Sequence, residues 1–219
     1  MSECLPALNG DTRNGMPTVF VVDDDPDVVT GLSRLLGVQG YRVRAYRSGN
    51  AFLNEHDPSV VGCVLIDFRL PDLSGLEVQA HLLRAAYRRP VVFLSGTADV
   101  PTSVQAMKDG AIDFLVKPIS ADQLFPAIAR AIARDIEQRR ASADRAAFEA
   151  MLQTLTPRER EVLPHLVTGR INKQIAGDFG VTEKTIKAHR AHIKAKLQAR
   201  SVADLVRFMS KLEQLRTAL

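Results

Sequence analysis

Four short apolar segments of the sequence each end in side chains that could carry out chemistry together. These side chains are, in chain order, Asp23 with Asp24 and Asp25, then Asp67, then Ser95, and finally Lys117. Carboxylates that gather at one place repel each other and need a compensating cation. Because only oxygen ligands are on offer, Mg²⁺ fits best, since it holds few protein carboxylates and keeps several water molecules.

The chemistry that such a group could perform is phosphoryl transfer. The carboxylate of Asp67 can attack a phosphoryl group and form an aspartyl-phosphate. Mg²⁺ would neutralise the oxygens of the transferred group, Lys117 would add a second positive charge, and the hydroxyl of Ser95 could hydrogen-bond the new phosphoryl oxygens. Each residue also has an ordinary structural explanation, such as Asp25 before Pro26 as a helix start, so the prediction depends on their occurring together.

The apolar segments that carry these side chains are predicted to be strands. They are rich in Val and Ile, and four of the five are nearly continuous, which is typical of parallel strands buried on both faces. Amphipathic helical patterns lie between them, so we expect a doubly wound α/β domain with a five-stranded parallel sheet. In such a sheet ligands bind at the carboxyl ends of the strands, near the point where strand order reverses. The five segments are 19–22, 42–45, 62–66, 91–94 and 114–116.

Residues 121–153 predict one long helical region. They contain no glycine, and an apolar residue recurs every four positions, at Leu124, Ile128, Ile132 and Ile136. Pro126 falls early in this region and could kink its first turns. The helix either packs on its own domain or also helps to dimerise the protein, and the sequence leaves both alternatives open.

The sequence after Leu155 shows helical patterns only. Thr156 followed by Pro157 and Glu159 predicts a helix start, and Ser201 begins a second pattern of the same kind. Residues 172–179 predict a short helix, Gly180 a turn, and Thr182 the cap of a helix over 183–197. This second helix is expected to lie in the major groove of DNA and to expose Lys184, Lys187, Arg190, Lys194 and Lys196.

The charge of the chain is divided unevenly. Residues 155–219 hold 13 Lys and Arg against 6 Asp and Glu, a net of +7, whereas the whole chain carries +4 and residues 1–154 therefore −3. A basic C-terminal part suits nucleic acid, although a solvated basic surface would look the same. No apolar segment could span a bilayer, no secretory signal appears, and the cysteines are too few for a disulfide framework. We therefore expect a soluble cytoplasmic protein without a membrane partner.

These patterns divide the chain into four parts. Residues 1–16 are polar and without periodicity, and we expect this N-terminal extension to be disordered. Residues 17–121 are assigned to the α/β domain, whose last helix runs to about residue 138. Residues 139–153 are assigned to a helical linker, and residues 154–219 to an all-α DNA-binding domain.

Four blocks of the α/β part resemble the receiver domains of two-component response regulators. They are 21–25 (Val-Val-Asp-Asp-Asp), 65–75 (Leu-Ile-Asp-Phe-Arg-Leu-Pro-Asp-Leu-Ser-Gly), 94–96 (Leu-Ser-Gly) and 114–118 (Phe-Leu-Val-Lys-Pro), in the family's order and spacing. The resemblance implies Asp67 as the phospho-acceptor. It implies a Mg²⁺ site formed by the acidic pair Asp23 and Asp24, by Asp67 and by the backbone carbonyl of Arg69. It also implies a cis peptide before Pro118 and the switch residues Ser95, Phe114 and Lys117.

Residues 154–212 resemble the LuxR-type helix-turn-helix, through 155–163, 172–176 and 181–189. The resemblance implies a four-helix domain that binds double-stranded DNA as a dimer. By analogy the residues that contact DNA are Lys173, Thr182, Lys184, Thr185, Lys187, Ala188, Arg190 and Lys194. Over nearly the whole chain after Met16 the sequence resembles the FixJ/NarL group of response regulators. This implies a sensor histidine kinase as phosphoryl donor, a homodimer when phosphorylated, and RNA polymerase as a further partner in transcription regulation.

Two other functions stay open. Phosphatases of the haloacid dehalogenase type also use an Asp nucleophile with Mg²⁺, but they need a second Asp two residues later, where this sequence has Arg69. The helix-turn-helix has no place in that function, so we do not expect an enzyme beyond the domain's own phosphorylation and dephosphorylation. The other alternative is a regulator that works unphosphorylated through partner binding, and DNA affinity unaffected by phosphorylation would support it.

Overall fold

The computed structural model describes residues 15–85, 88–96 and 100–217, and it divides the chain into two compact units, Met1–Glu137 and Gln138–Leu219. The segment 1–16, for which the sequence predicts disorder, lies outside the described residues except for Gly15 and Met16. Within the described part, no helix combines the length and the hydropathy needed to cross a membrane.

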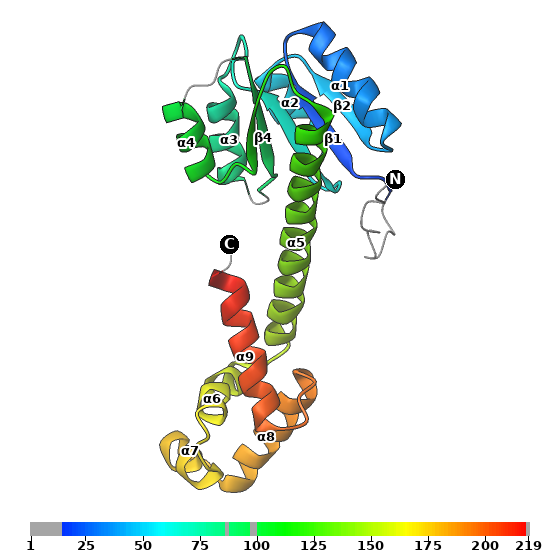
Figure 1. Ribbon diagram of the computed structural model, residues 1–219. Helices are drawn as coiled ribbons and strands as arrows, with labels where there is room; N and C mark the ends of the chain where they lie inside the picture. The colour runs from blue at the N-terminus through cyan, green and yellow to red at the C-terminus, as the bar shows by residue number, and fades with distance from the viewer. Residues whose placement is uncertain (1–14, 86–87, 97–99, 218–219) are drawn as a thin grey trace. The chain divides into compact units, whose positions relative to one another are not determined.

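The first unit is built on a five-stranded parallel sheet with the order β2-β1-β3-β4-β5 (Figure 1). Its strands are β1 Thr18–Val22, β2 Arg42–Tyr46, β3 Gly62–Asp67, β4 Val91–Ser95 and β5 Asp113–Val116. All residues of β1, β3 and β4 are buried, because helices cover both faces of the sheet. The strand order reverses at β1, which pairs with both β2 and β3. The predicted doubly wound fold is confirmed.

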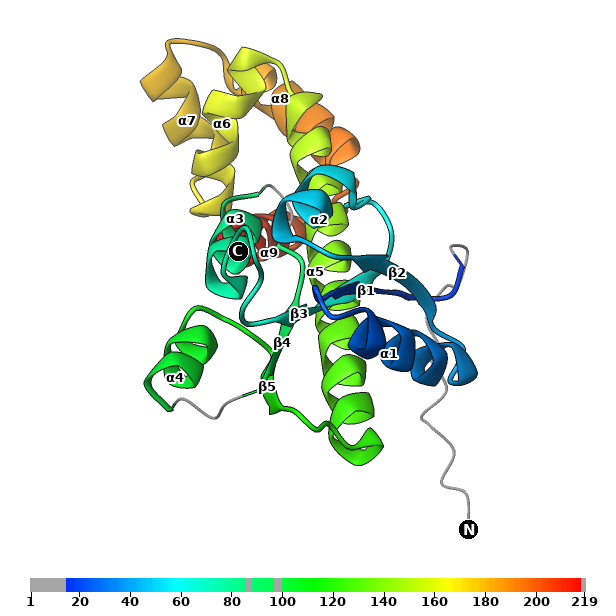
Figure 2. The ribbon, with the colours of Figure 1, turned by 90° about the horizontal axis from the view of Figure 1, so that it is seen from above.

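Helices lie on opposite faces of this sheet (Figure 2), and one hydrophobic cluster attaches them on each face. On one face Leu36 of α1 and Ile128 of α5 pack with Val21. On the other face Phe52 of α2 packs with Phe20, together with side chains of α3 and α4. Neighbouring residues of β1 point to opposite faces, so one short strand contributes to both clusters. The helices are α1 Pro26–Val38, α2 Gly49–Glu55, α3 Gly75–Arg84, α4 Val100–Lys108 and α5 Ala121–Gln153.

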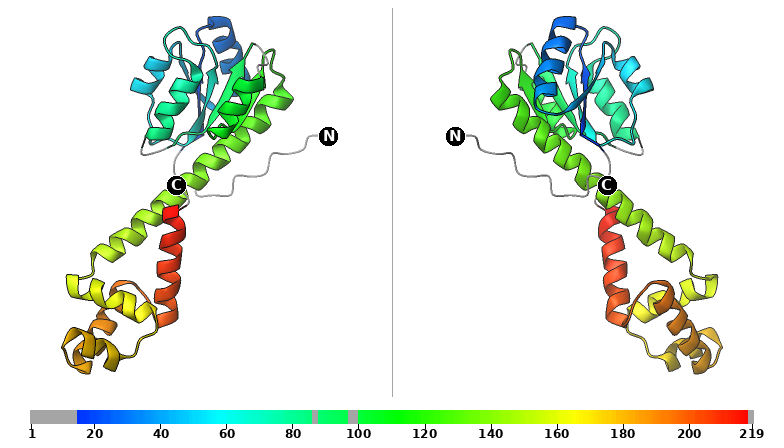
Figure 3. Two further views of the ribbon diagram at one scale, coloured as in Figure 1. Left: turned by 90° about the vertical axis from the view of Figure 1, so that its left-hand side faces the viewer. Right: turned by 90° about the vertical axis from the view of Figure 1, so that its right-hand side faces the viewer.

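Helix α5 passes through Pro126 and continues to its end without interruption (Figure 3). The expected apolar stripe ends before Ile136, which is 40% exposed, whereas the adjacent Asp135 is fully buried. The reason is a hydrogen bond in which the buried N–H of Gly62 donates to Asp135 Oδ2 (3.0 Å). A buried backbone N–H needs an acceptor, and this requirement outweighs the apolar pattern.

The second unit packs its helices around one apolar core, which includes Val162, Ile175, Ile186 and Leu205. Thr156 caps the first of these helices: its Oγ1 accepts from the N–H of Glu159 (3.2 Å), while Glu159 Oε2 accepts from the N–H of Thr156 (2.8 Å). Gly180 turns the chain with a φ of 62°, which glycine adopts readily. The predicted all-α domain is confirmed. The end of α5 packs against this core through Phe148, Met151 and Leu152, and the helices that follow are α6 Pro157–Val167, α7 Asn172–Phe179, α8 Glu183–Lys196 and α9 Val202–Thr217.

Gly62 is expected to tolerate no side chain. A Cβ atom at this position would lie 1.9 Å from the carbonyl oxygen of Thr18 on the neighbouring strand. Gly62→Ala should therefore lower the free energy of unfolding of the first unit by at least about 3 kcal/mol, because the backbones must separate. The matched control is Gly31→Ala in α1, where nothing lies within 4 Å of the added Cβ. Gly31→Ala should raise the free energy of unfolding by up to about 1 kcal/mol. Equal free energies of unfolding for the two variants in urea denaturation would show that the backbone of Thr18 does not exclude a side chain at Gly62.

Candidate functional site

The side chains that the sequence singles out follow four neighbouring strands. Asp23 comes directly after β1, Asp67 and Ser95 are the last residues of β3 and β4, and Lys117 comes directly after β5. The strands β1, β3, β4 and β5 are adjacent in this order and parallel. Their carboxyl ends therefore meet at one edge of the sheet, beside the reversal of strand order at β1.

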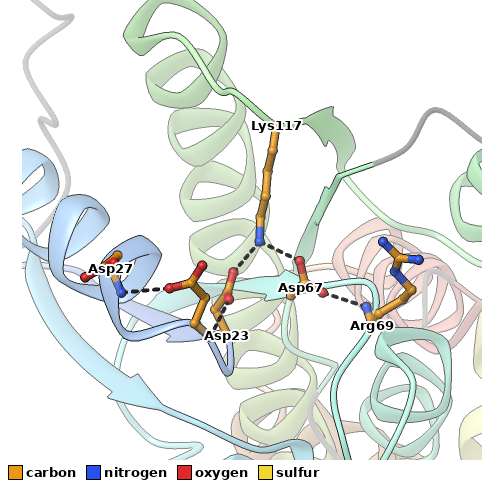
Figure 4. A network of polar contacts seen from close by, with 6 residues as sticks. Asp23, Asp27, Asp67, Arg69 and Lys117 are labelled. Atoms are coloured by element: carbon orange, nitrogen blue, oxygen red, sulfur yellow. Dashed lines mark hydrogen bonds and ion pairs between the residues drawn. The ribbon is translucent and has the colours of Figure 1, made fainter.

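Lys117 joins two of the carboxylates (Figure 4). Its Nζ lies 2.6 Å from Asp23 Oδ2 and 2.6 Å from Asp67 Oδ1. The other oxygen of each carboxylate accepts from a backbone N–H, of Asp25 to Asp23 (3.0 Å) and of Arg69 to Asp67 (2.7 Å). Asp23 is 1% exposed and Asp67 is 8% exposed. These contacts fix both carboxylates, of which that of Asp67 is the more exposed.

Burial and charge act against each other in this group. Burial raises the pKa of Asp23 above its ordinary value, although the hydrogen bonds from Lys117 and the backbone oppose the change. For Lys117, burial acts to lower the pKa, but the hydrogen bonds to Asp23 and Asp67 outweigh it and the pKa is raised. Lys117 therefore keeps its positive charge next to the carboxylate of Asp67.

The residues at this edge fit a divalent cation with few protein ligands. Two buried carboxylates face a single ammonium group, and the exposed Asp24 adds a further negative charge beside them. In the described part of the chain, no three His, Cys, Asp or Glu side chains lie close enough together to enclose a metal ion. Mg²⁺ needs no such enclosure, because it commonly uses one or two carboxylates together with water and phosphate oxygens. The donor set of Asp23, Asp24, Asp67 and the Arg69 carbonyl consists of oxygen only.

The chain after Asp67 forms a tight loop that presents Arg69. An isolated antiparallel bridge pairs Arg69 with Ser74, and the N–H of Gly75 donates to the carbonyl of Phe68 (3.0 Å). A Cβ at Gly75 would lie 2.9 Å from the carbonyl oxygen of Asp67, so the loop closes against its own start. Ser74 caps α3 at the other end of the loop, in a capping box.

Of the three expected switch residues, Ser95 and Lys117 lie at the ends of β4 and β5, and Phe114 lies within β5. Ser95 is buried, and its carbonyl accepts from the N–H of Lys117 (2.7 Å). The peptide bond between Lys117 and Pro118 is cis. Phe114 is half-buried on β5, with its ring centroid 6.1 Å from that of Phe68 and 6.2 Å from that of Phe93. Phe114 also lines a pocket with α4 residues, which include Ser103, Val104 and Met107.

The expected DNA-contacting residues lie on α7, on α8 and at the N-cap of α8, with unequal exposure. Lys173, Thr182, Lys184, Lys187 and Ala188 are exposed, whereas Thr185, Arg190 and Lys194 are half-buried. The hydroxyls of Thr182 and Thr185 lie 2.9 Å apart, and Thr182 caps α8 through the N–H of Thr185. Arg190 donates to Asn172 Oδ1 (3.3 Å). The exposed cations of this set are Lys173 on α7 and Lys184 and Lys187 in the N-terminal half of α8.

Sequence reasoning missed the role of Lys196, which it placed among the exposed cations of α8. Lys196 Nζ lies 2.7 Å from Oε2 of the buried Glu159, and this ion pair joins α8 to the start of α6. The capping-box position of Glu159 predicted a hydrogen bond of its carboxylate to Thr156. It did not predict the ion pair with Lys196, which lies 37 residues further along the chain. Lys196 is consequently a structural cation.

The ion pair of Glu159 is expected to make the second unit sensitive to acid. Burial acts to raise the pKa of Glu159, but the hydrogen bonds from Lys196 and Thr156 outweigh it, and the pKa lies below the ordinary 4.5. An ionised Glu159 thus stabilises the fold above pH 4.5, and this contribution is lost as the pH falls through the lowered pKa. Because Lys196 is one-third exposed, Glu159→Gln should cost about 1 kcal/mol at neutral pH. The difference in stability between the parent and Glu159→Gln should shrink in acid. If their denaturation midpoints differ by the same amount at pH 7 and pH 3, the ion pair does not stabilise the fold.

Comparison with protein families gives one match in each unit. Residues 19–129 match the response regulator receiver domain. Residues 153–209 match the bacterial regulatory proteins of the luxR family. The first match contains Asp23, Asp24, Asp67, Ser95 and Lys117, and the second contains α6, α7 and α8.

Individual proteins match over both units. Nodulation protein W of Bradyrhizobium diazoefficiens is 40% identical over 194 residues, which cover 89% of this chain and 86% of that protein. Transcriptional regulatory protein FixJ of Rhizobium meliloti is 37% identical over 190 residues, which cover 87% and 93%. The solved structure of response regulator StyR matches with a TM-score of 0.81 and 40% identity, over 90% of this chain and 100% of that one.

Proposed function

Because the chain belongs to the response regulators that join a receiver domain to a LuxR-type DNA-binding domain, we propose that phosphorylation of Asp67 controls its binding to DNA. Family membership makes the chain a two-component transcription regulator. The proposal rests on one observation above all, which is that Lys117 holds the buried carboxylates of Asp23 and Asp67 at the strand ends.

In the proposed reaction a carboxylate oxygen of Asp67 attacks the phosphorus of a phosphohistidine on a sensor kinase. The bond from phosphorus to the imidazole nitrogen breaks, that nitrogen keeps the electron pair, and Asp67 becomes an aspartyl-phosphate. Bound Mg²⁺ supplies positive charge for the oxygens of the transferred group. Asp23, Asp24 and the Arg69 carbonyl would hold it together with Asp67. Lys117 offers its ammonium to the phosphoryl oxygens, and Ser95 offers its hydroxyl.

The proposed signal runs from Ser95 and Phe114 to the surface formed by α4 and β5. Val104, Met107 and Val116 are exposed apolar side chains on that surface. A change in Ser95 on phosphorylation would alter the packing of Phe114, which lines the same pocket as these three residues. Two such surfaces would then associate in a homodimer and present two copies of α8 to a two-fold DNA site, where RNA polymerase would be a further partner.

We assign the receiver domain to residues 17–121, with its last helix to about 138, the linker to 139–153 and the DNA-binding domain to 154–219. The family matches over 19–129 and 153–209, and the division of the units after Glu137, support this assignment. The linker is helical throughout. Its exposed residues leave it free to take part in the dimer as well.

The proposal is tested by measuring the protein's mass in solution and its DNA affinity at a fixed salt concentration, with and without a small-molecule phosphodonor and Mg²⁺. We expect phosphorylation to yield a dimer and to raise the affinity about 5- to 150-fold, the usual range of coupling between two sites. Unchanged mass and unchanged affinity in a protein that has taken up phosphate would contradict the proposal. That result would favour a regulator that acts without phosphorylation.

A further inference from the structure

Asp72 links the loop after Asp67 to the start of helix α2. Its Oδ1 accepts from the N–H of Gly49 (3.0 Å), and its Oδ2 accepts from the N–H of Asn50 (2.8 Å). Some burial acts to raise the pKa of Asp72, but these backbone N–H groups outweigh it and hold the pKa below its ordinary value. Both carboxylate oxygens of Asp72 are thus engaged on an element 22 residues away in the sequence.

The packing around this link is close. A Cβ atom at Gly49 would lie 2.8 Å from the side chain of Val78 on α3 and 3.2 Å from Cβ of Leu73 in the loop. The start of α2 therefore rests on the loop itself, at the residue next to Asp72. A shift of the loop would have to move α2 or break the two hydrogen bonds to Asp72.

The other end of the same loop holds the reacting group. Arg69 donates its N–H to Asp67 Oδ2 (2.7 Å), and its bridge to Ser74 ties it to the part of the loop that contains Asp72. The position of the Arg69 carbonyl, which the proposed function places on Mg²⁺, is therefore set by the loop as a whole. We propose that Asp72 is a positioning residue for phosphoryl transfer, which holds the loop so that Arg69 and Asp67 face the cation. This inference rests on the proposed function.

Asp72 would have a simpler role if it only capped α2. That helix has another cap, since Ser48 Oγ accepts from the N–H of Ala51 (3.1 Å). Removing Ser48 leaves one N–H of α2 without its partner, and removing Asp72 leaves two. Only Asp72, however, belongs to the loop that follows Asp67. Ser48→Ala is consequently the matched control, because it weakens the same helix end and leaves the loop intact.

The test compares the parent protein with Asp72→Ala, Asp72→Asn and Ser48→Ala in the full chain. The first readout is hydrogen exchange at the N–H of Arg69, measured without Mg²⁺ or phosphodonor, and we expect at least about tenfold faster exchange in Asp72→Ala. The second is the Mg²⁺ concentration for half-maximal phosphorylation by a small-molecule phosphodonor. It should rise about tenfold or more, the usual cost of losing a group that orients a ligand. Asp72→Asn keeps one oxygen acceptor, so both readouts should lie between those of the parent and those of Asp72→Ala.

Ser48→Ala should change neither readout. The inference is overturned if Asp72→Ala matches the parent in both, or if Ser48→Ala reproduces the changes of Asp72→Ala. If Asp72→Ala does not fold, Asp72→Asn decides by the same two criteria. If the parent takes up no phosphoryl group, the proposed function fails, whereas exchange at Arg69 still decides whether Asp72 positions the loop.

Discussion

Asp67→Asn is expected to abolish phosphoryl uptake and, with it, the gain in DNA affinity. The amide has the shape of the carboxylate, but it lacks the anionic oxygen that attacks phosphorus. Its oxygen can still accept from Lys117 or from Arg69, so the fold should survive the change. The measurement is incorporation of a phosphoryl group from a small-molecule phosphodonor in Mg²⁺, followed by DNA binding at fixed salt.

The control for Asp67 is Asp122→Asn, which makes the same chemical change at an exposed aspartate in the first turn of α5. Asp122→Asn should take up phosphate and bind DNA as the parent does. Uptake by Asp67→Asn equal to that of the parent would show that another residue is the acceptor. If Asp67→Asn takes up no phosphate but still gains DNA affinity as the parent does, DNA binding does not depend on phosphorylation of Asp67.

The double variant Lys184→Ala with Lys187→Ala is expected to weaken DNA binding severely. Both lysines are exposed in the N-terminal half of α8, where a recognition helix meets the bases. Loss of a base contact should cost about 1 to 3 kcal/mol, and loss of a phosphate contact should lower the salt dependence of binding by about one unit of slope. Titration of DNA at several salt concentrations distinguishes the two kinds of contact.

Lys211→Ala is the matched control for these lysines. Lys211 is also exposed in the second unit, but it lies on α9. Its removal should leave the affinity within about twofold of the parent, because an exposed charge that contacts neither base nor phosphate is largely screened by salt. Equal losses in Lys211→Ala and in the double variant would mean that DNA responds to overall charge and that α8 is not the recognition helix.

The strand ends were predictable because parallel strands impose their own geometry. Once 19–22 and 62–66 are assigned to neighbouring parallel strands, the residues that follow them must lie at one edge. In the structure Asp23 and Asp67 both contact Lys117, at the edge of the sheet where the strand assignment alone would place them. Helix starts were predictable for a similar reason, since Thr156 and Glu159 satisfy each other within four residues.

Contacts between distant polar groups were not predictable. The sequence around Asp135 favours an apolar stripe through Ile136, whereas in the structure the buried Asp135 carboxylate accepts from the N–H of Gly62, which lies 73 residues away. Lys196 has the spacing of an exposed cation, yet it faces Glu159. In each case the partner depends on how two elements pack, and no local pattern of residues records that packing.

The most direct test of the proposed function is to locate the phosphoryl group on the parent protein. The protein is treated with a small-molecule phosphodonor and Mg²⁺, and its peptides are then analysed by mass spectrometry under conditions that preserve an acyl phosphate. One phosphoryl group is expected, on Asp67, and none in the protein treated without Mg²⁺. A phosphoryl group on any other residue, or none at all on a folded protein, would contradict the assignment of Asp67 as the phospho-acceptor.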